Sequence, residues 1–186
     1  MIDFDDVCFS YGEKEIFSNL TFHIGTGERV ALRGESGCGK TTLLRLIMGL
    51  ETQRRGTVTV RTNRVSVLFQ ENRLLPYKSV AQNCELFAAD RAAVRPMLRE
   101  LGLEDAADAI PSALSGGMAR RSALARALCR GAALYLFDEP FDGLDAENVA
   151  RAAEVINRVT VGKTVLVVTH HGDEAEMLNC KRELQI

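Results

Sequence analysis

The sequence lacks any apolar run approaching the roughly 20 residues that cross a lipid bilayer. Its first residues, Met1-Ile2-Asp3-Phe4-Asp5-Asp6, do not combine a basic segment with an apolar stretch, so they do not form a secretory signal. We therefore expect a cytosolic protein with neither a signal peptide nor a transmembrane segment.

An excess of charge of either sign is also missing. The 23 Lys and Arg residues nearly balance the 25 Asp and Glu residues, which leaves a formal net charge of -2. This balance gives no reason to expect a nucleic-acid partner held by bulk electrostatics. The cysteines contain no CxxC pair, and none lies at zinc-ligand spacing with a histidine. We interpret them as free thiols in a reducing compartment: Cys8, Cys38, Cys84, Cys129 and Cys180.

Internal repeats and low-complexity segments are absent as well. Apolar residues at 46% and charged residues at 26% are ordinary for a globular protein. A chain of 186 residues fits one domain, with or without a small subdomain, and is long enough for a sizeable core.

Short alternating or apolar segments between turns predict strands in the N-terminal part. They cover residues 3–9, 20–24, 29–33, 56–60 and 64–69. Thr62-Asn63, between the last two segments, suggests that these two form a hairpin. An apolar stripe predicts a helix over residues 41–48, which stops at Gly49.

The second half begins with a helical segment, residues 71–112, which is rich in Ala, Leu, Arg and Glu. Helices predicted over residues 116–130 and 146–159 then alternate with apolar strands over residues 134–137 and 165–168. Buried strands that alternate with helices indicate an α/β fold with a mostly parallel sheet covered on both faces. The early hairpins add an antiparallel β portion.

A glycine-rich segment matches G-x-x-x-x-G-K-[ST] at every fixed position: Gly34-Glu35-Ser36-Gly37-Cys38-Gly39-Lys40-Thr41. It lies between a predicted buried strand and a predicted helix. Glycines let backbone N–H groups wrap around a phosphate, and the helix start adds its positive dipole end. We expect Lys40 to reach the β- and γ-phosphates and Thr41 to ligate Mg²⁺. The alternative is a turn that only caps the helix and leaves Lys40 solvated.

Two adjacent acids, Asp138 and Glu139, follow the apolar strand predicted over residues 134–137. Successive side chains of a strand point to opposite sides, so the two carboxylates can have different roles. Asp138 can hold Mg²⁺, directly or through water, and Glu139 can polarise the water that attacks the γ-phosphate. Pro140 then ends the strand. On its own, the pattern is also that of a solvated strand end.

Leu114-Ser115-Gly116-Gly117-Met118 closely resembles the signature motif of ATP-binding cassette (ABC) proteins, LSGG followed by Gln or a similar residue. Ser115 is a natural N-cap, and the two glycines leave N–H groups open to an anion at a helix start. Without the other motifs, the same residues predict no more than a capped helix.

The resemblance to ABC ATPases covers residues 1–186 in the order of the family. It implies a P-loop NTPase cassette with a core of residues 1–70 and 113–186 and a helical subdomain at about residues 71–112. Tyr11 matches the aromatic residue on which adenine stacks, and His170 matches the histidine that contacts the γ-phosphate. Gln70 matches the glutamine whose side chain faces the metal and the attacking water. Asp145 matches the close of the D-loop and is also a candidate N-cap.

The resemblance implies ATP and Mg²⁺ as cofactors. The implied catalytic residues are Glu139, His170, Lys40 and Gln70, and the implied metal site contains Thr41, Gln70 and Asp138. The implied nucleotide-binding residues are Tyr11, Gly34, Glu35, Ser36, Gly37, Cys38, Gly39, Lys40, Thr41, Thr42, Ser115, Gly116 and Gly117.

Three positions depart from the family pattern. Met118 replaces the usual Gln, residues 141–143 replace commoner small and hydroxyl residues, and His171 stands where an acid is frequent. None of these changes removes a group that the chemistry requires. We also expect a near-minimal cassette without a C-terminal regulatory domain.

In this family, the LSGG of one cassette caps ATP held by another, which implies a head-to-tail homodimer. The helical subdomain is expected to contact a membrane permease at the cytoplasmic face. Residues 71–80 look like the corresponding stretch of nitrate, sulfonate and taurine importer cassettes. We therefore expect the ATPase subunit of an importer of small anions, working with a substrate-binding protein.

Other importers, and lipid-transport cassettes with a Met in the signature, remain open as well. Two further alternatives come from other classes. One is a soluble ABC ATPase of the iron–sulfur assembly or ribosome-associated type. The other is a nucleotide-binding module that no longer hydrolyses ATP, against which the intact Lys40, Asp138, Glu139 and His170 argue.

Overall fold

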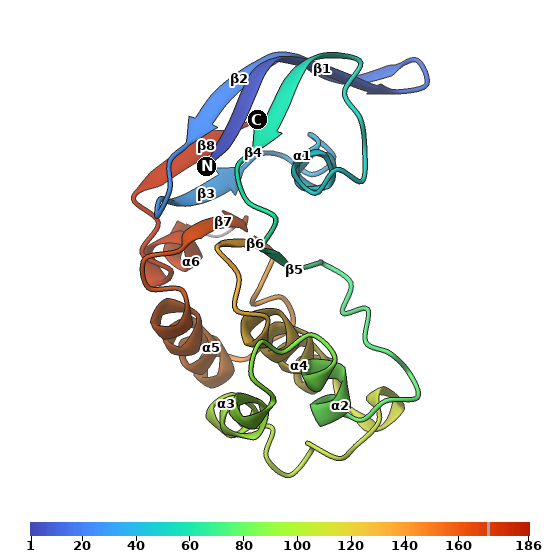
Figure 1. The fold of residues 1–186 in the computed structure, drawn as a ribbon, viewed down its shortest axis with the longest axis vertical. Coiled ribbons are helices and arrows are strands. Elements are labelled where there is room, and N and C mark those ends of the chain that lie inside the picture. Colours follow the sequence, from blue (N-terminus) through green and yellow to red (C-terminus); the bar gives the residue numbers. More distant parts are fainter. Residues whose placement is uncertain (171) are drawn as a thin grey trace.

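Two β-sheets and a group of helices make up the computed structural model, which describes residues 1–170 and 172–186 (Figure 1). The strands are β1 Ile2–Tyr11, β2 Lys14–Ile24, β3 Arg29–Arg33, β4 Arg55–Val60, β5 Val65–Leu68, β6 Leu134–Asp138, β7 Thr164–Val168 and β8 Arg182–Gln185. The α-helices are α1 Lys40–Ile47, α2 Val80–Glu85, α3 Val94–Glu100, α4 Gly116–Cys129, α5 Ala146–Val159 and α6 Gly172–Met177. Two 3₁₀ turns, η1 Arg91–Ala93 and η2 Pro111–Ala113, complete the set.

The larger sheet is parallel and has the strand order β5-β6-β7-β3-β8, and the smaller sheet is antiparallel with the order β2-β1-β4. This arrangement confirms the predicted α/β class with an added antiparallel portion. Neither α6 nor β8 was predicted from the sequence.

The hairpin predicted around Thr62 and Asn63 is wrong. β4 pairs with β1, with Ile2 opposite Val60, whereas β5 pairs with β6, with Val65 beside Leu134. The two residues therefore lead the chain from one sheet to the other. An alternating pattern specifies which face of a strand is buried, but it does not specify which strand lies beside it.

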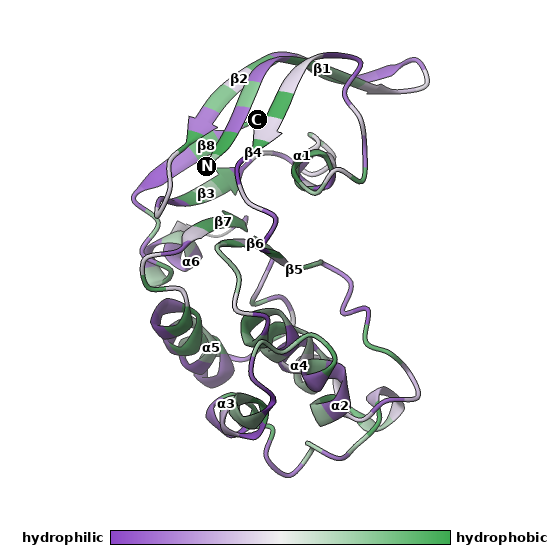
Figure 2. Ribbon diagram, in the orientation of Figure 1, coloured by the Kyte–Doolittle hydropathy of each residue, from purple (hydrophilic) through white to green (hydrophobic). Residues whose placement is uncertain are grey.

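The central strands β6 and β7 are buried along their whole length, and Figure 2 shows them hydrophobic. Their side chains alternate between two hydrophobic clusters. In β6, Leu134 and Leu136 join the cluster around α1, while Tyr135 and Phe137 join the cluster of the helical side. A strand covered on both faces needs apolar residues at every position, which explains its unbroken apolar sequence.

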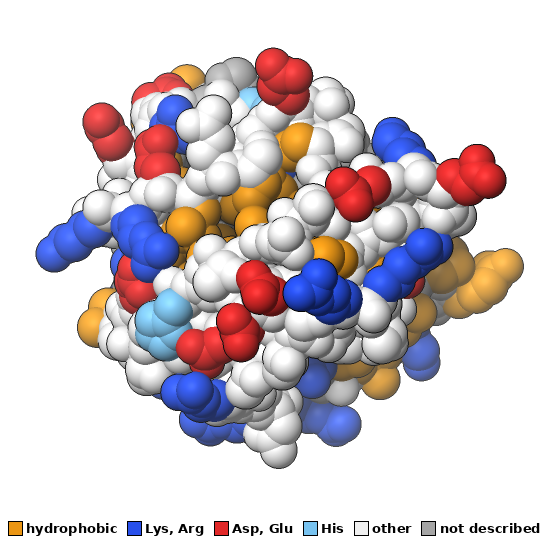
Figure 3. Space-filling model, turned by 90° about the horizontal axis from the view of Figure 1, so that it is seen from above, with side chains coloured by type: hydrophobic (Ala, Val, Ile, Leu, Met, Phe, Trp, Pro, Cys, Tyr) orange, Lys and Arg blue, Asp and Glu red, His pale blue; other side chains and the backbone are white. Residues whose placement is uncertain are grey.

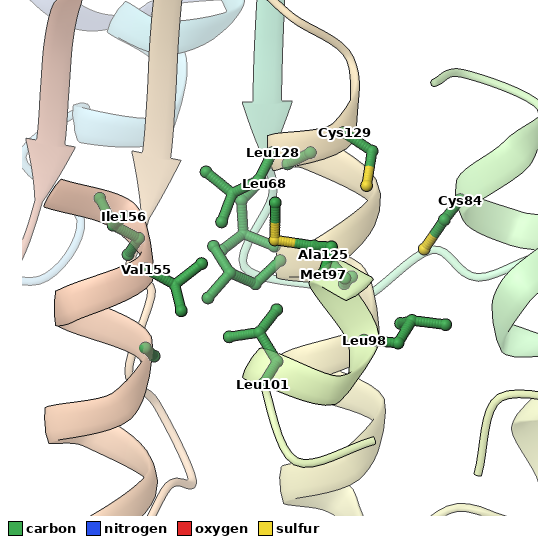
Figure 4. Packing of buried hydrophobic residues seen from close by; sticks show 14 of the residues in the cluster. Leu68, Cys84, Met97, Leu98, Leu101, Ala125, Leu128, Cys129, Val155 and Ile156 are labelled. Atoms are coloured by element: carbon green, nitrogen blue, oxygen red, sulfur yellow. The ribbon is translucent and has the colours of Figure 1, made fainter. Parts of the chain in front are cut away.

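The cluster around α1 also contains β1 and β3, so α1 lies between the two sheets (Figure 1). On the other face of the parallel sheet, α3, α4 and α5 pack together through buried residues. Figure 4 shows members of this cluster: Leu68, Met97, Leu98, Leu101, Ala125, Leu128, Val155 and Ile156.

Cys84 of α2 and Cys129 of α4 are buried in the same cluster (Figure 4). A hydrogen bond with Cys129, together with burial, raises the pKa of the Cys84 thiol. All five cysteines are free thiols in the described part of the chain, as predicted.

The helical segment of residues 71–112 contains only two short α-helices, α2 and α3, joined by turns. Asn83 organises its first loop: the Oδ1 atom accepts from Leu75 N at 2.8 Å, and Nδ2 donates to the carbonyls of Leu75, Lys78 and Ser79. One fully buried amide thus satisfies a stretch of backbone that forms no regular structure.

The surface carries charges of both signs. Figure 3 shows acidic and basic side chains interspersed over the face seen from above. No helix among residues 1–170 and 172–186 has the length and apolar character needed to span a membrane.

Candidate nucleotide-binding site

The phosphate loop leaves β3 after Arg33 and enters α1 at Lys40. Gly39, the N-cap of α1, has a φ of 112°, and a Cβ atom there would lie 2.6 Å from Cγ2 of Ile16. Only glycine fits this position without displacing its neighbours. No side chain of the described residues caps α1. Its first amides therefore remain able to bind an anion.

Lys40 holds the loop in a closed shape. Its side chain is buried, and its Nζ atom donates to the carbonyls of Gly34 and Glu35, both at 2.8 Å. The ammonium group consequently stays at the centre of the loop, where a bound phosphate would meet it.

A cavity of about 340 Å³ opens in front of the loop. It lies within the size range of small-molecule sites. Its lining comes from the β1–β2 hairpin, the phosphate loop, and the segments that follow β5, β6 and β7. The lining residues are Tyr11, Lys14, Ile16, Ser36, Gly37, Gly39, Lys40, Thr41, Thr42, Gln70, Asp138, Glu139 and His170.

The three predicted catalytic side chains outside the loop meet in this cavity. Nε2 of Gln70 lies 3.5 Å from Oε2 of Glu139, and Nε2 of His170 lies 3.0 Å from Oε1. The three residues follow β5, β6 and β7, which are neighbours in the sheet. Because parallel strands place their carboxyl ends at one edge, segments far apart in sequence converge there.

Asp138 is buried, and its Oδ2 atom lies 3.4 Å from Oγ1 of Thr41. Burial raises the pKa of the Asp138 carboxyl, and the negative charge of Glu139 adds to the rise. Nearby Arg120 and Lys40 act in the opposite direction without cancelling it. Two adjacent carboxylates and a hydroxyl form a set of hard oxygen donors. The nearby positive charges of Arg120 and Lys40 do not fully offset the negative charge of this set. Such a set fits a hard divalent cation such as Mg²⁺.

Glu139 has an unusual backbone. Its φ is +50°, in the left-handed region that non-glycine residues seldom adopt. Its amide donates to the carbonyl of Val168 at 2.9 Å, which ties the end of β6 to β7. Backbone strain of this kind is common at functional sites, where the surrounding structure maintains it.

Tyr11 borders the cavity on the side of the antiparallel sheet. Its hydroxyl lies 3.1 Å from Oε1 of Glu51 and 3.4 Å from NH1 of Arg45. Its ring packs edge-on against Phe9, with centroids 4.9 Å apart. These contacts orient the ring of a residue that remains 42% exposed beside the cavity.

The signature residues lie elsewhere on the chain. Ser115 is the N-cap of α4, and its hydroxyl accepts from Met118 N at 3.2 Å. Among the described residues of this single chain, Ser115, Gly116 and Gly117 do not line the cavity. Asp145 is the N-cap of α5 and accepts from Asn148 N at 2.9 Å, which confirms the predicted capping.

Sequence reasoning missed Lys14 and Ile16, which line the cavity from β2. It also missed Arg120, a buried side chain that bonds to the segments bearing Gln70 and Glu139. No motif signals these positions. The departure noted at His171 lies outside the described residues.

A phosphate loop ahead of α1, together with an acidic pair at the end of β6, defines a P-loop nucleotide hydrolase. Comparison with known proteins narrows this class. The family model described as ABC transporter matches residues 17–142. The chain belongs to this family and is the ATP-binding, ATP-hydrolysing subunit of an ABC transporter.

The chain is similar to the "Aliphatic sulfonates import ATP-binding protein SsuB" of Delftia acidovorans, with 46% identity over 176 residues. That alignment covers 91% of this chain and 73% of the relative. The protein of the same name from Granulibacter bethesdensis is 47% identical over 173 residues, which cover 90% of this chain and 72% of the relative.

Among solved structures, the chain resembles the dimeric ATP-binding cassette MJ0796 in a post-hydrolysis state bound to ADP and Pi. The TM-score is 0.88 at 27% identity, with coverage of 100% of this chain and 94% of that chain.

Proposed function

We propose that this chain drives the import of aliphatic sulfonates through a membrane permease, with a substrate-binding protein as a further component. The convergence of Gln70, Glu139 and His170 on one cavity beside the phosphate loop carries the catalytic part of this proposal. The names of the relatives support the substrate class. They also disfavour a soluble ATPase of the iron–sulfur assembly or ribosome-associated type.

The phosphate loop binds the triphosphate of ATP. The free amides at the start of α1 and the loop backbone surround the phosphates, and Lys40 exchanges its bonds to Gly34 and Glu35 for bonds to phosphate oxygens. The exposed ring of Tyr11 stacks on adenine. The remaining implied residues, Glu35, Ser36, Gly37, Cys38 and Thr42, contribute mainly backbone.

Thr41, Asp138 and Gln70 hold Mg²⁺ in this proposal. A bound Mg²⁺ neutralises charge that develops on the phosphate oxygens. Burial, together with the charge of Glu139, raises the pKa of Asp138 in the free protein, and a divalent cation held there would offset that charge.

Glu139 orients the attacking water and takes up its proton. Its two oxygens already face different partners: His170 lies near Oε1 and Gln70 near Oε2. His170 can hold the carboxylate in place and reach the γ-phosphate. Gln70 can transmit the presence of bound nucleotide to the helical segment, residues 71–112.

A second cassette completes the site. In a single chain, Ser115 and the two glycines after it lie outside the cavity, although the start of α4 is a suitable anion-binding group. Two copies that close head to tail bring this helix start to the nucleotide held by the partner's phosphate loop. The dimeric cassettes among the solved relatives support such a homodimer.

The permease binds in a groove between the core, residues 1–70 and 113–186, and the helical subdomain, residues 71–112. The groove has a volume of about 600 Å³ and an apolar part of its lining that includes Val67 and Phe87. Arg73, Arg126 and Arg130 also line it. Apolar side chains bordered by guanidinium groups suit an amphipathic permease segment that carries acidic residues.

Growth on a sulfonate tests the whole proposal. A strain without this gene is expected to lose growth on an alkanesulfonate as sole sulfur source and to keep growth on sulfate. Wild-type protein should restore growth, Lys40→Ala should not, and the exposed Lys181→Ala should. Undiminished sulfonate growth without the gene, in a strain with no second importer, contradicts the assigned substrate.

A further inference from the structure

Arg120 lies at the meeting point of three segments. It is 3% exposed and projects from the second turn of α4, five residues after Ser115. NH1 donates to the carbonyls of Phe69 and Gln70 at 2.6 and 3.0 Å, and lies 3.3 Å from Oδ1 of Asn72. NH2 donates to the carbonyls of Asp138 and Glu139 at 2.5 and 2.6 Å.

We propose that Arg120 is a positioning residue for ATP hydrolysis: its guanidinium sets the alignment of Gln70 with Glu139 and makes that alignment depend on the position of α4. This inference rests on the catalytic role proposed above for Glu139.

The planar guanidinium suits this task. Its two terminal nitrogens point in fixed directions, so carbonyls bound to one nitrogen are held in register with carbonyls bound to the other. NH1 fixes the backbone from which the Gln70 side chain departs, and NH2 fixes the backbone of Glu139. The alignment of these two side chains is therefore set through a single group.

The contact to Glu139 matters because its backbone is strained. The carbonyl of Glu139 accepts from NH2, and its φ of +50° persists only where neighbours hold it. Without the guanidinium, relaxation of this residue toward ordinary backbone angles would turn the carboxylate away from Gln70 and His170.

Burial of Arg120 has an evident cost. Desolvation lowers the pKa of its guanidinium, although Asp142, Asp138 and Glu139 act in the opposite direction. A charged group that is surrounded by four carbonyls and three carboxylates carries a desolvation penalty that an apolar side chain of similar size would avoid. Its location between the catalytic segments gives it a purpose beyond packing.

The position of Arg120 on α4 connects the catalytic residues of one cassette with the second cassette of the proposed dimer, which contacts the start of the same helix. A bonded helix moves as a unit, so a displacement of its Ser115 end shifts Arg120 with it. Closure of a second cassette onto Ser115 therefore adjusts Gln70 and Glu139 in the same chain.

The test compares Arg120→Gln with Arg121→Gln. Arg121, the next residue on α4, also binds two carbonyls, those of Leu101 and Gly102 at 2.7 and 3.1 Å, but it belongs to neither catalytic segment. Arg120→Gln is expected to lower kcat about 10- to 100-fold, the usual effect of losing an outer-shell partner, with KM for Mg-ATP changed less than threefold. Arg121→Gln should keep kcat within threefold of wild type.

Hydrogen exchange gives a readout independent of activity. Arg120→Gln should speed exchange of amides in residues 70–72 and 139–142, whereas Arg121→Gln should do so around residues 101–103. If Arg120→Gln does not fold, Arg120→Lys replaces it. This variant keeps the positive charge but lacks the two terminal nitrogens of the planar guanidinium, and it should still lower kcat at least about threefold.

An unchanged kcat in Arg120→Gln or Arg120→Lys overturns the inference. So does an equal loss of kcat in Arg121→Gln, or a rise in KM alone. Glu139→Gln, assayed in parallel, separates the two proposals. If it hydrolyses ATP at the wild-type rate, the role of Glu139 fails; if it is inactive while Arg120→Gln is fully active, only the role of Arg120 fails.

Discussion

Nε2 of His170 lies 3.0 Å from Oε1 of Glu139, although the two residues are 31 positions apart in the sequence. The two residues follow β7 and β6, which are adjacent parallel strands. A histidine that contacts the same carboxylate as Gln70 leaves that carboxylate little freedom. This site, the start of α4 and the proposed permease groove suggest five experiments.

Glu139→Gln is expected to keep ATP binding and lose hydrolysis. The amide nearly preserves the size of the carboxylate but cannot accept a proton, so kcat should fall about 10²- to 10⁴-fold. Phosphate release measures the loss, and gel filtration with ATP should reveal a dimer that accumulates. The exposed Glu154→Gln serves as control. A variant that remains monomeric at high protein and ATP concentrations contradicts the head-to-tail dimer.

Tyr11→Ala should weaken ATP binding about tenfold, because stacking of a base on an aromatic ring contributes about 1–3 kcal/mol. Tyr11→Phe should bind nearly as well as wild type, since the ring and its packing on Phe9 are kept. Equilibrium titration with a fluorescent ATP analogue measures both. Tyr77→Ala, at a residue 93% exposed, is the control. Equal affinities of Tyr11→Ala and wild type would remove Tyr11 from the site.

Ser115→Arg should spare nucleotide binding by the monomer and reduce hydrolysis at least about 100-fold, the loss expected when transition-state stabilisation is removed. The larger cationic side chain replaces the N-cap of α4, the helix start that the proposed head-to-tail dimer would bring to the partner's nucleotide. Binding and phosphate release are measured on the same preparation. The exposed Ser18→Arg controls for added charge. Normal turnover in Ser115→Arg argues against any role of this residue at the nucleotide.

Asp138→Asn should stabilise the nucleotide-free protein and abolish hydrolysis. Burial and Glu139 raise the native pKa of Asp138, so its ionisation lowers native stability. This penalty is complete above the native pKa and absent below the unfolded value, near 3.8. The melting temperature should rise a few degrees at neutral pH, and the gain should shrink as the pH falls.

The exposed Asp105→Asn should show no such gain. If Asp138→Asn melts below wild type at neutral pH, the charge of Asp138 is stabilising and the stated direction of its pKa shift is wrong.

Phe87→Asp should weaken the complex with the permease and leave basal ATP hydrolysis unchanged. The substitution places a charge in the apolar part of the groove. Co-purification from membranes and phosphate release measure the two effects. Met177→Asp is a matched control, because Met177 on α6 has the same exposed fraction as Phe87, 44%. Retention of the complex by Phe87→Asp places the permease elsewhere.

The strands, the longer helices and the phosphate loop could be predicted because their signals are local. The glycines at fixed spacing before Lys40 and the unbroken apolar run before Asp138 are each contained in a short continuous stretch of sequence. Short elements without strong periodicity, α6 and β8, escaped prediction. The pairing of β4 and β5 was predicted wrongly, since turn residues such as Thr62 are compatible with a hairpin and with a crossover between sheets.

The sequence by itself determined which residue types are available for phosphate, metal and water, and the order in which they occur along the chain. Only the tertiary structure decided which of them meet. The parallel order of β5, β6 and β7 brings Gln70, Glu139 and His170 to one edge, and burial of α4 places Arg120 between two of their segments. The physical reason is that strand pairing and helix burial depend on contacts between residues distant in sequence, whereas motifs and periodicity record only neighbours along the chain.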